Sequence, residues 1–220
     1  MGNHHAGHGH EMFRDRIHAG RVLAEDLAHH SLRAPVVLGL ARGGVPVAVE
    51  VAAALGAPVR AGVARKIGAP GQPELALGAV AADGPPVYDH RLLRAFDLDE
   101  DRLHPQCERE RHRARQQEHQ YGQDPLPELA GRDVIVVDDG LATGATARAA
   151  IRRVRGVGPA RVVLAVPVGA PDGLTALRRE ADLVVCPRRP ADFSAVGQWY
   201  RDFSPVTDDR VRELLATPTR

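Results

Sequence analysis

The chain has 220 residues, of which 44% are hydrophobic and 26% are charged, and its formal net charge is +1. These values fit one folded domain, or a domain with a small lobe, and exclude an intrinsically disordered chain. No apolar run approaches the ~18 residues of a membrane span, and the first residues lack the apolar core of a signal peptide. The two cysteines, Cys107 and Cys186, exclude a disulfide framework and a paired-cysteine zinc site. We therefore expect a soluble, cytoplasmic enzyme or binding protein with no membrane partner, and the near-neutral charge disfavours nucleic acid as a ligand.

In chain order, residues 1–11 come first, with four histidines and no apolar periodicity. We interpret them as a disordered leader or an expression remnant. Metal capture by the histidines is the alternative, which their flexible spacing disfavours. Beyond them, short apolar runs alternate with stretches of helical period. The pattern predicts strands over 36–40, 59–63, 77–81, 134–137, 162–166 and 183–186, and helices over 13–30, 46–55, 146–155, 174–181 and 208–215. It also predicts a loop over 68–73 and one or two charged surface helices over 91–121, divided near Pro105.

This alternation predicts an α/β fold, in which a mostly parallel twisted sheet is flanked by helices. We expect the core over 12–186, with 91–121 as a helical surface insertion, and a small C-terminal lobe with a helix over 187–220. Ligands of such sheets bind at the carboxyl ends of the strands. The unusual residues of this chain gather there, within 41–46, 64–74, 138–146 and 187–200.

The most specific motif is the segment 134–146, VIVVDDGLATGAT. Its four apolar residues predict a buried strand, and Asp138 and Asp139 stand at the carboxyl end of that strand. The loop that follows leads into a helix, and the backbone amides of this loop favour binding of a phosphate. The loop consists of Gly140, Leu141, Ala142, Thr143, Gly144, Ala145 and Thr146. Two carboxylates repel a phosphate, but they accept hydrogen bonds from the hydroxyls of a sugar that carries the phosphate at its other end. We therefore infer a ribose 5-phosphate unit as the ligand. The alternative is a plain strand-to-helix turn with an aspartate cap; the P-loop and dinucleotide patterns are missing.

A second motif, Ala-Arg-Gly-Gly over 41–44, follows the first predicted strand. Arg42 offers a guanidinium fork and Gly43 and Gly44 offer exposed amides, which suit a diphosphate, although a plain glycine turn would also explain them. Arg65 and Lys66 follow the second predicted strand, and Lys66 is the only lysine among 29 lysine and arginine residues. We expect these two cations to bind a pyrophosphate, with a pair of solvated charges at a strand end as the alternative, and we expect the segment 67–74 to close as a lid.

Four of the eight aromatic residues fall within the eleven residues 193–203. We expect Trp199 or Tyr200 to stack on a flat heterocyclic acceptor, with core packing as an equal alternative, and we expect Phe193 and Phe203 to pack in a core. The tract 108–115 mixes arginines with glutamates and has no aromatic residue. We therefore interpret it as a solvated helix rather than as a nucleic-acid surface.

With these residues the sequence resembles the type I phosphoribosyltransferases. The segment 134–146 is similar to their thirteen-residue phosphoribosyl-pyrophosphate signature, and the blocks ARGGVP, ARKIGAPGQPELALGAVA and AVGQWYRDFSPVTD resemble a bacterial subgroup of the family. The resemblance implies that Asp138 and Asp139 hold the ribose 2- and 3-hydroxyls and that the loop 140–146 holds the 5-phosphate. It also implies a pyrophosphate loop over 41–44, closest to the xanthine-guanine type, in which family members can have a non-proline cis peptide. The resemblance also places the C-terminal aromatic segment, with the lobe 187–220, in the variable hood that selects the substrate in the family.

The implied activity is transfer of a 5-phosphoribosyl group from phosphoribosyl pyrophosphate to a nitrogenous base or related acceptor, with release of pyrophosphate. Mg²⁺ is the implied cofactor, at Asp138 and Asp139, directly or through water, while Arg42 and Lys66 stabilise the leaving group. Ala142 stands where enzymes for 6-oxopurines usually carry an aspartate, which disfavours such an acceptor. A non-catalytic nucleotide-sensing regulator and a hydrolase of phosphoribosyl pyrophosphate or nucleotides stay open as alternatives, as does a homodimer.

Overall fold

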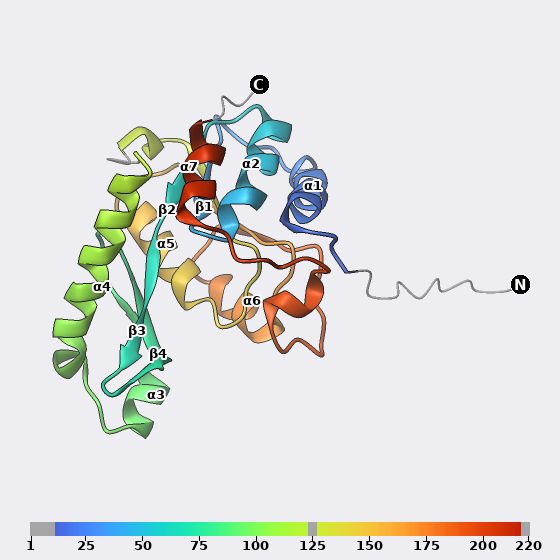
Figure 1. Cartoon of the computed structure of the whole chain (residues 1–220). Helices are drawn as coiled ribbons and strands as arrows, with labels where there is room; N and C mark the ends of the chain where they lie inside the picture. The colour runs from blue at the N-terminus through green and yellow to red at the C-terminus, as the bar shows by residue number, and fades with distance from the viewer. Residues whose placement is uncertain (1–11, 123–126, 217–220) are drawn as a thin grey trace, which may run out of the picture.

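The strands form two separate sheets in the computed structural model, which describes residues 12–122 and 127–216. The first sheet is parallel and has five strands in the order β2-β1-β6-β7-β8 (Figure 1). Its strands are β1 (Val36–Leu40), β2 (Val59–Gly62), β6 (Asp133–Val137), β7 (Arg161–Ala165) and β8 (Leu183–Val185). The parallel α/β architecture predicted from the sequence is therefore confirmed, whereas the predicted leader 1–11 lies outside the described residues.

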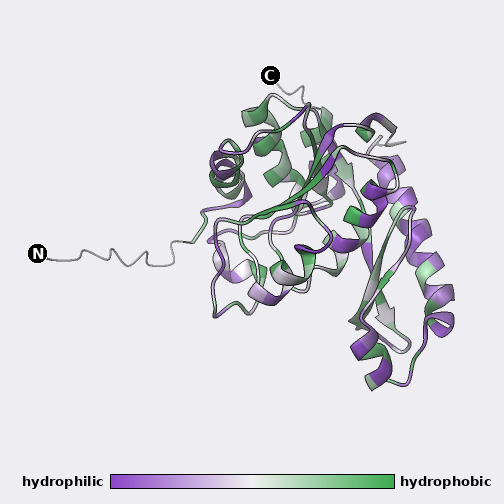
Figure 2. Ribbon diagram, turned by 180° about the vertical axis from the view of Figure 1, so that it is seen from behind, coloured by the Kyte–Doolittle hydropathy of each residue, from purple (hydrophilic) through white to green (hydrophobic). Residues whose placement is uncertain are grey.

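Helices cover both faces of the parallel sheet. On one face, α1 (Arg16–Leu27) and α2 (Gly44–Leu55) pack on alternate strand residues such as Val37 and Ile135. On the other face, α5 (Ala145–Arg155) and α6 (Pro171–Leu177) pack on the intervening residues such as Leu38 and Val136. Successive side chains of a strand point to opposite faces, so a strand covered on both faces needs an unbroken apolar run. In Figure 2 the apolar colour extends over the strands of this sheet and over α2, whereas α4 (Glu100–Gln120) is mostly hydrophilic.

The helix ends follow local signals in the sequence. The Asp15 carboxylate accepts a hydrogen bond from the His18 amide at 2.7 Å, so α1 begins at Arg16 and not at Phe13 as predicted. Helix α6 begins three residues earlier than predicted because Pro171 occupies its first turn, where a missing amide hydrogen costs nothing. The last helix, α7 (Asp208–Ala216), has Thr207 as its cap, since the Thr207 hydroxyl accepts from the Arg210 amide at 3.1 Å.

The second sheet is antiparallel and corrects two predictions. It consists of β3 (Ala64–Ala69), β4 (Gln72–Ala81) and β5 (Val87–Tyr88), in that order. The predicted loop over 68–73 is instead the end of the β3–β4 hairpin, with Pro70 and Gly71 in the turn. Gly71 has a φ of 76°, as the third residue of a Pro-Gly type II turn requires. The predicted strand 77–81 therefore pairs outside the parallel sheet, and the segment 67–74 is the end of a hairpin; its closure as a lid stays a prediction.

The charged segment 91–121 forms two helices, α3 (His90–Ala95) and α4 (Glu100–Gln120). The break lies at 96–99 and not near Pro105, which α4 accommodates within its second turn at the cost of one backbone hydrogen bond. Along one side α4 packs on β3 and β4, and buries Leu103 and Cys107. The tract 108–115 is therefore solvated on its outer face only, and Glu110 is 8% exposed.

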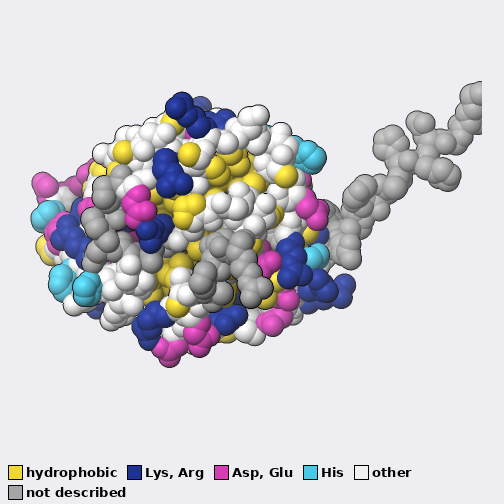
Figure 3. Space-filling model, turned by 90° about the horizontal axis from the view of Figure 1, so that it is seen from above, with side chains coloured by type: hydrophobic (Ala, Val, Ile, Leu, Met, Phe, Trp, Pro, Cys, Tyr) yellow, Lys and Arg dark blue, Asp and Glu magenta, His cyan; other side chains and the backbone are white. Residues whose placement is uncertain are grey.

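The hood is built from both ends of the described chain. Its short helix η2 (Val196–Trp199) lies beside the segment that precedes α1, where the Phe13 amide donates to the Trp199 carbonyl at 2.8 Å. The Arg201 amide donates to the Phe13 carbonyl at 2.8 Å. A second short helix, η1 (Pro127–Leu129), precedes β6. Across the described ranges, no helix has both the length and the apolarity to cross a membrane. The face drawn in Figure 3 intermixes charges of both signs with apolar side chains.

Candidate active site

The two glycine-containing motifs meet at the carboxyl ends of β1 and β6, because these two parallel strands are neighbours. A Cβ added to Gly43 would lie 2.1 Å from Asp139 Oδ2, and one added to Gly44 would lie 2.6 Å from the Val137 carbonyl oxygen. Neither position has room for a larger residue, so glycine is required here by close approach. The peptide bond between Ala41 and Arg42 is cis, as the resemblance implied. The segments 41–44 and 138–146 therefore form one site.

Asp138 and Asp139 lie at the carboxyl end of β6 and are both partly buried. Asp138 Oδ1 accepts a hydrogen bond from the Asp139 amide at 2.9 Å, and Asp139 Oδ2 accepts from Arg16 Nε at 2.8 Å. Burial, and then the charge of Asp139, raise the pKa of Asp138 well above its usual range. Burial also raises the pKa of Asp139, against the opposing effect of Arg16. Such a pair gains from a ligand that brings hydroxyl donors or a cation to it.

The loop 140–146 connects this carboxyl pair to α5. Gly144 caps α5 with a φ of 78° and without a side-chain hydrogen bond, and the first turn contains no acidic residue. The first amides of a helix have no partner within it, so they are available to an anion. Ala142 and Thr143 are exposed beside them. Leu141 differs, because its side chain is buried and its amide donates to the Val168 carbonyl at 2.9 Å. Leu141 therefore anchors the loop. The prediction that its amide binds a phosphate does not fit, because that amide already donates to Val168.

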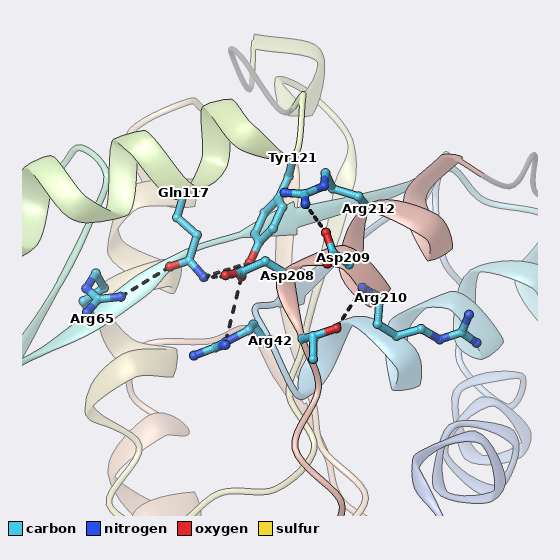
Figure 4. Close-up of polar contacts among 9 residues, drawn as sticks. Arg42, Arg65, Gln117, Tyr121, Asp208, Asp209, Arg210 and Arg212 are labelled. Atoms are coloured by element: carbon cyan, nitrogen blue, oxygen red, sulfur yellow. Dashed lines mark hydrogen bonds and ion pairs between the residues drawn. The ribbon is translucent and has the colours of Figure 1, made fainter.

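Arg42 projects from the other motif and is half exposed. Its Nε lies 3.9 Å from Asp208 Oδ1 on α7 (Figure 4). Asp208 also accepts from Gln117 Nε2 on α4 at 3.0 Å and from the hydroxyl of Tyr121, the residue that follows α4. The Tyr121 hydrogen bond holds the pKa of Asp208 below its usual range. Arg42 thus remains accessible to an anion, with a carboxylate from the C-terminal helix beside it that sequence reasoning did not identify.

Arg65 and Lys66 both lie on β3 and face opposite sides of the hairpin, because side chains alternate along a strand. Arg65 Nε donates to Glu110 Oε2 at 2.7 Å. Its Nη1 donates to Gln117 Oε1 at 3.3 Å, a contact that Figure 4 shows. Lys66 is exposed and pairs in register with Ala79, which packs against α5. The structure therefore separates the two predicted pyrophosphate ligands: Arg65 is bound to α4, and Lys66 lies on the side of α5.

Trp199 and Tyr200 are buried, with 4% and 3% exposure. Tyr200 stacks at a tilt on Phe13 and Phe203, and its hydroxyl donates to the Asp139 carbonyl oxygen at 2.5 Å. Burial of this kind leaves almost no ring surface for a ligand. The structure therefore favours core packing over the predicted stacking on an acceptor, and it gives Tyr200 a contact with the backbone of the carboxyl pair.

Arg16 is the second site residue that sequence reasoning missed. It lies 123 positions before Asp139 and in the first turn of an ordinary amphipathic helix, so no local pattern distinguishes it. Only the packing of α1 beside the parallel sheet brings its guanidinium to the carboxyl pair.

The donor set of the site suits a hard cation that a ligand helps to hold. Within the described residues, no group of three or more His, Cys, Asp or Glu side chains could hold a metal ion. The carboxyl pair offers at most two side chains, both with oxygen donors. Mg²⁺ is commonly bound in this way, by one or two carboxylates, waters and the phosphates of a substrate.

Comparisons of the sequence and of the structure with known proteins identify one family. The sequence model of the phosphoribosyl transferase domain matches residues 14–199. Two curated relatives, "Putative phosphoribosyl transferase Rv0571c" and "Putative phosphoribosyl transferase MT0597", come from two strains of Mycobacterium tuberculosis. Each is 48% identical over 212 residues, which are 93% of this chain and 46% of the relative. The chain thus spans about half the length of the curated relatives it matches. The crystal structure of TT1426 from Thermus thermophilus is 46% identical, with a TM-score of 0.75, and the match covers 93% of this chain and 97% of that one.

Proposed function

The chain belongs to the phosphoribosyl transferase domain family, and from this premise we propose that it transfers a 5-phosphoribosyl group from phosphoribosyl pyrophosphate to a nitrogenous acceptor. The observation that carries the proposal is the contact between Gly43 and Asp139. It brings a diphosphate-type loop and a phosphate-type loop to the two sides of one carboxyl pair. A ribose that bears a phosphate at one end and a diphosphate at the other has this arrangement of groups.

In this mechanism the loop 140–146 binds the 5-phosphate through the free amides at the start of α5. Asp138 and Asp139 accept hydrogen bonds from the ribose hydroxyls and hold the sugar in one orientation. The bond from the ribose C1 to the pyrophosphate oxygen breaks, and positive charge develops on C1 and the ring oxygen. The acceptor nitrogen then forms the new bond to C1, and its proton leaves to solvent or to a base.

The cations of the site stabilise the leaving pyrophosphate. Arg42 offers a bidentate fork from the loop 41–44, and exposed Lys66 supplies a compact charge from β3. Arg65 contributes through α4 and not by direct contact, since Glu110 and Gln117 occupy its guanidinium. Mg²⁺ would be held by Asp138 and Asp139, directly or through water, and when bound it neutralises charge on the pyrophosphate.

The acceptor in this proposal is a small heterocycle other than a 6-oxopurine. Ala142 is exposed at the position where the resemblance would place an aspartate for a 6-oxopurine. A methyl group neither accepts nor donates the proton that such a base exchanges. With Trp199 and Tyr200 buried, the acceptor is recognised by other groups of the hood and of the loop.

The test is the double variant Asp138→Asn with Asp139→Asn. We expect it to abolish pyrophosphate release from phosphoribosyl pyrophosphate and a mixture of bases, with Mg²⁺, because the amides supply neither the charge nor both acceptor oxygens. Its melting temperature should show that the fold is retained. Asp172→Asn, an exposed carboxylate in the first turn of α6, is the matched control and should keep full activity.

The same assay separates the alternatives. Pyrophosphate release without any base would identify a hydrolase. Nucleotide binding or an RNA gel shift without pyrophosphate release would identify a regulator. Unchanged activity of the double variant would contradict the assignment of the ribose to the carboxyl pair.

A further inference from the structure

Asp139 is held in one orientation by contacts from three directions. Its amide donates to Asp138 Oδ1, its carbonyl oxygen accepts from the Tyr200 hydroxyl at 2.5 Å, and its Oδ2 accepts from Arg16 Nε at 2.8 Å. Of these, the contact from Arg16 is the one that reaches the carboxylate itself. Among the other residues that the structure describes, Arg16 donates to the Asp139 carboxylate and does so at Oδ2, which leaves Oδ1 to face a ligand.

Arg16 is itself fixed by contacts to the hood. Its Nη1 donates to the Ser204 carbonyl oxygen at 2.9 Å, and its guanidinium carbon lies 4.0 Å from the centre of the Phe203 ring. Its side chain is only 11% exposed. The planar guanidinium meets a carboxylate, a carbonyl and a ring face at once, with donors in a rigid fork that the compact ammonium group of a lysine lacks.

The position of Arg16 in α1 argues against a role in the helix. A cation in the first turn of a helix is unfavourable because the N-terminal end of the helix dipole is positive. Asp15 already caps this helix through the His18 amide. The charge of Arg16 is therefore compensated outside α1, and its compensating partner is Asp139.

We propose that Arg16 is a positioning residue for the ribose: it holds Asp139 Oδ2 and so presents Oδ1 to a ribose hydroxyl. This inference rests on the proposed function and extends it to a residue outside the signature motif. Since Ser204 and Phe203 belong to the segment that follows η2, Arg16 also makes the orientation of Asp139 depend on the seating of the hood. Gly43 lies against the same pair, as a Cβ added there would be 3.4 Å from Arg16 Nε.

The test compares Arg16→Met, which keeps the apolar stem, with Arg16→Lys, which keeps the charge. The matched control is Arg21→Met, on the same helix, where an arginine that is 60% exposed pairs with Glu50. Each protein is titrated with phosphoribosyl pyrophosphate and Mg²⁺, and separately with inorganic phosphate. The ligand-dependent rise in melting temperature reports the affinity.

We expect Arg16→Met to weaken binding of phosphoribosyl pyrophosphate by about tenfold or more, because a hydrogen bond to a charged group is lost. Phosphate binding should be unchanged, because the loop 140–146 does not depend on Asp139 Oδ1. Arg16→Lys should recover part of the loss, and Arg21→Met should bind both ligands as the unaltered chain does. In the background of Asp139→Asn, adding Arg16→Met should cost little further affinity, since the residue acts through Asp139.

Three outcomes would overturn the inference. Unchanged binding of phosphoribosyl pyrophosphate by Arg16→Met would show that Asp139 needs no positioning. An equal loss of affinity for both ligands would show that Arg16 has a general structural role. If Arg16→Met does not fold, the affinities for the two ligands are compared in Arg16→Lys instead. Failure of the unaltered chain to bind phosphoribosyl pyrophosphate would contradict the proposed function, and with it the inference.

Discussion

Single residues at the carboxyl ends of β1 and β6 are constrained by how closely their neighbours approach them. Gly43 faces Asp139, and Asp139 faces Arg16, so three segments that are distant in the sequence share one small volume. A motif search identifies Gly43 and Asp139 because each lies in a recognisable pattern. Arg16 lies in no pattern, and its importance follows only from its neighbours.

Substituting Gly43 by alanine tests this crowding. The new methyl group would meet Asp139 Oδ2 at 2.1 Å, so the carboxylate must move. We expect Gly43→Ala to weaken binding of phosphoribosyl pyrophosphate by at least about tenfold, since the ribose contact and the pyrophosphate loop are displaced together. Titration calorimetry with Mg²⁺ present measures the change. Gly156→Ala, at a right-handed helical position whose nearest neighbours are carbonyls of its own helix, is the control; equal affinity for both variants would contradict the expected clash.

Among the elements, α5 links the phosphate loop to the rest of the fold. Its N-terminus faces the ligand site, and its last turn contains Arg152, Arg153 and Arg155, which complement the negative end of the helix dipole. Arg152 binds Glu180, just beyond α6, through two hydrogen bonds of 2.8 and 3.1 Å. The helix that presents the amides is therefore tied at its far end.

The Glu180 contact predicts a pH-dependent contribution to stability. Hydrogen bonds from Arg152 hold the pKa of Glu180 below its usual value of 4.5, so the contribution is present above that value and is lost as the pH falls through the lowered pKa. We expect Glu180→Gln to lower the free energy of unfolding at pH 7 by about 1 kcal/mol, because a partly exposed ion pair contributes little. The difference from the unaltered chain should shrink as the pH falls below the usual value. Melting temperatures across this range measure it, with the exposed Glu25→Gln as control; a difference that is constant with pH would contradict the prediction.

In the whole molecule, the two sheets are joined through a buried charged group. Glu118 on α4 is 2% exposed and accepts from the Val63 amide at 2.7 Å, between β2 and β3. It also binds Arg153 on α5, which pairs with Asp83 at 2.6 Å. These contacts connect the hairpin layer, with Lys66, to the helix that carries the phosphate loop.

Removing this carboxylate should destabilise the whole chain. Glu118→Ala leaves the Val63 amide and part of the Arg153 charge buried without their partner. We expect a loss of about 3 kcal/mol in the free energy of unfolding, at the lower end for a buried pair because Asp83 stays on Arg153. Urea unfolding at pH 7 measures the loss, and Glu108→Ala, an exposed site on the same helix, should change little. A loss below about 1 kcal/mol, as for a surface pair, would show that the layers are held by apolar packing alone.

The sequence by itself determined the parallel sheet, most helix positions and the site motifs. Short runs of β-branched apolar residues such as 134–137 are typical of buried strands, and the Asp-Asp pair with its small-residue loop directly follows this run in the sequence. These are local properties, set by periodicity and by the chemistry of adjacent residues. The Pro-Gly turn at 70–71 belongs to the same class, although the glycines and prolines of 68–73 also fit a longer loop.

Only the tertiary structure decided which distant groups meet. It paired β3 with β4 outside the main sheet, buried Trp199 and Tyr200, and brought Arg16 to Asp139 and Asp208 to Arg42. Arg16 and its hood partner Ser204 are 188 residues apart in the chain. Contacts of this kind depend on how whole helices and sheets pack against one another, and local periodicity does not encode that packing.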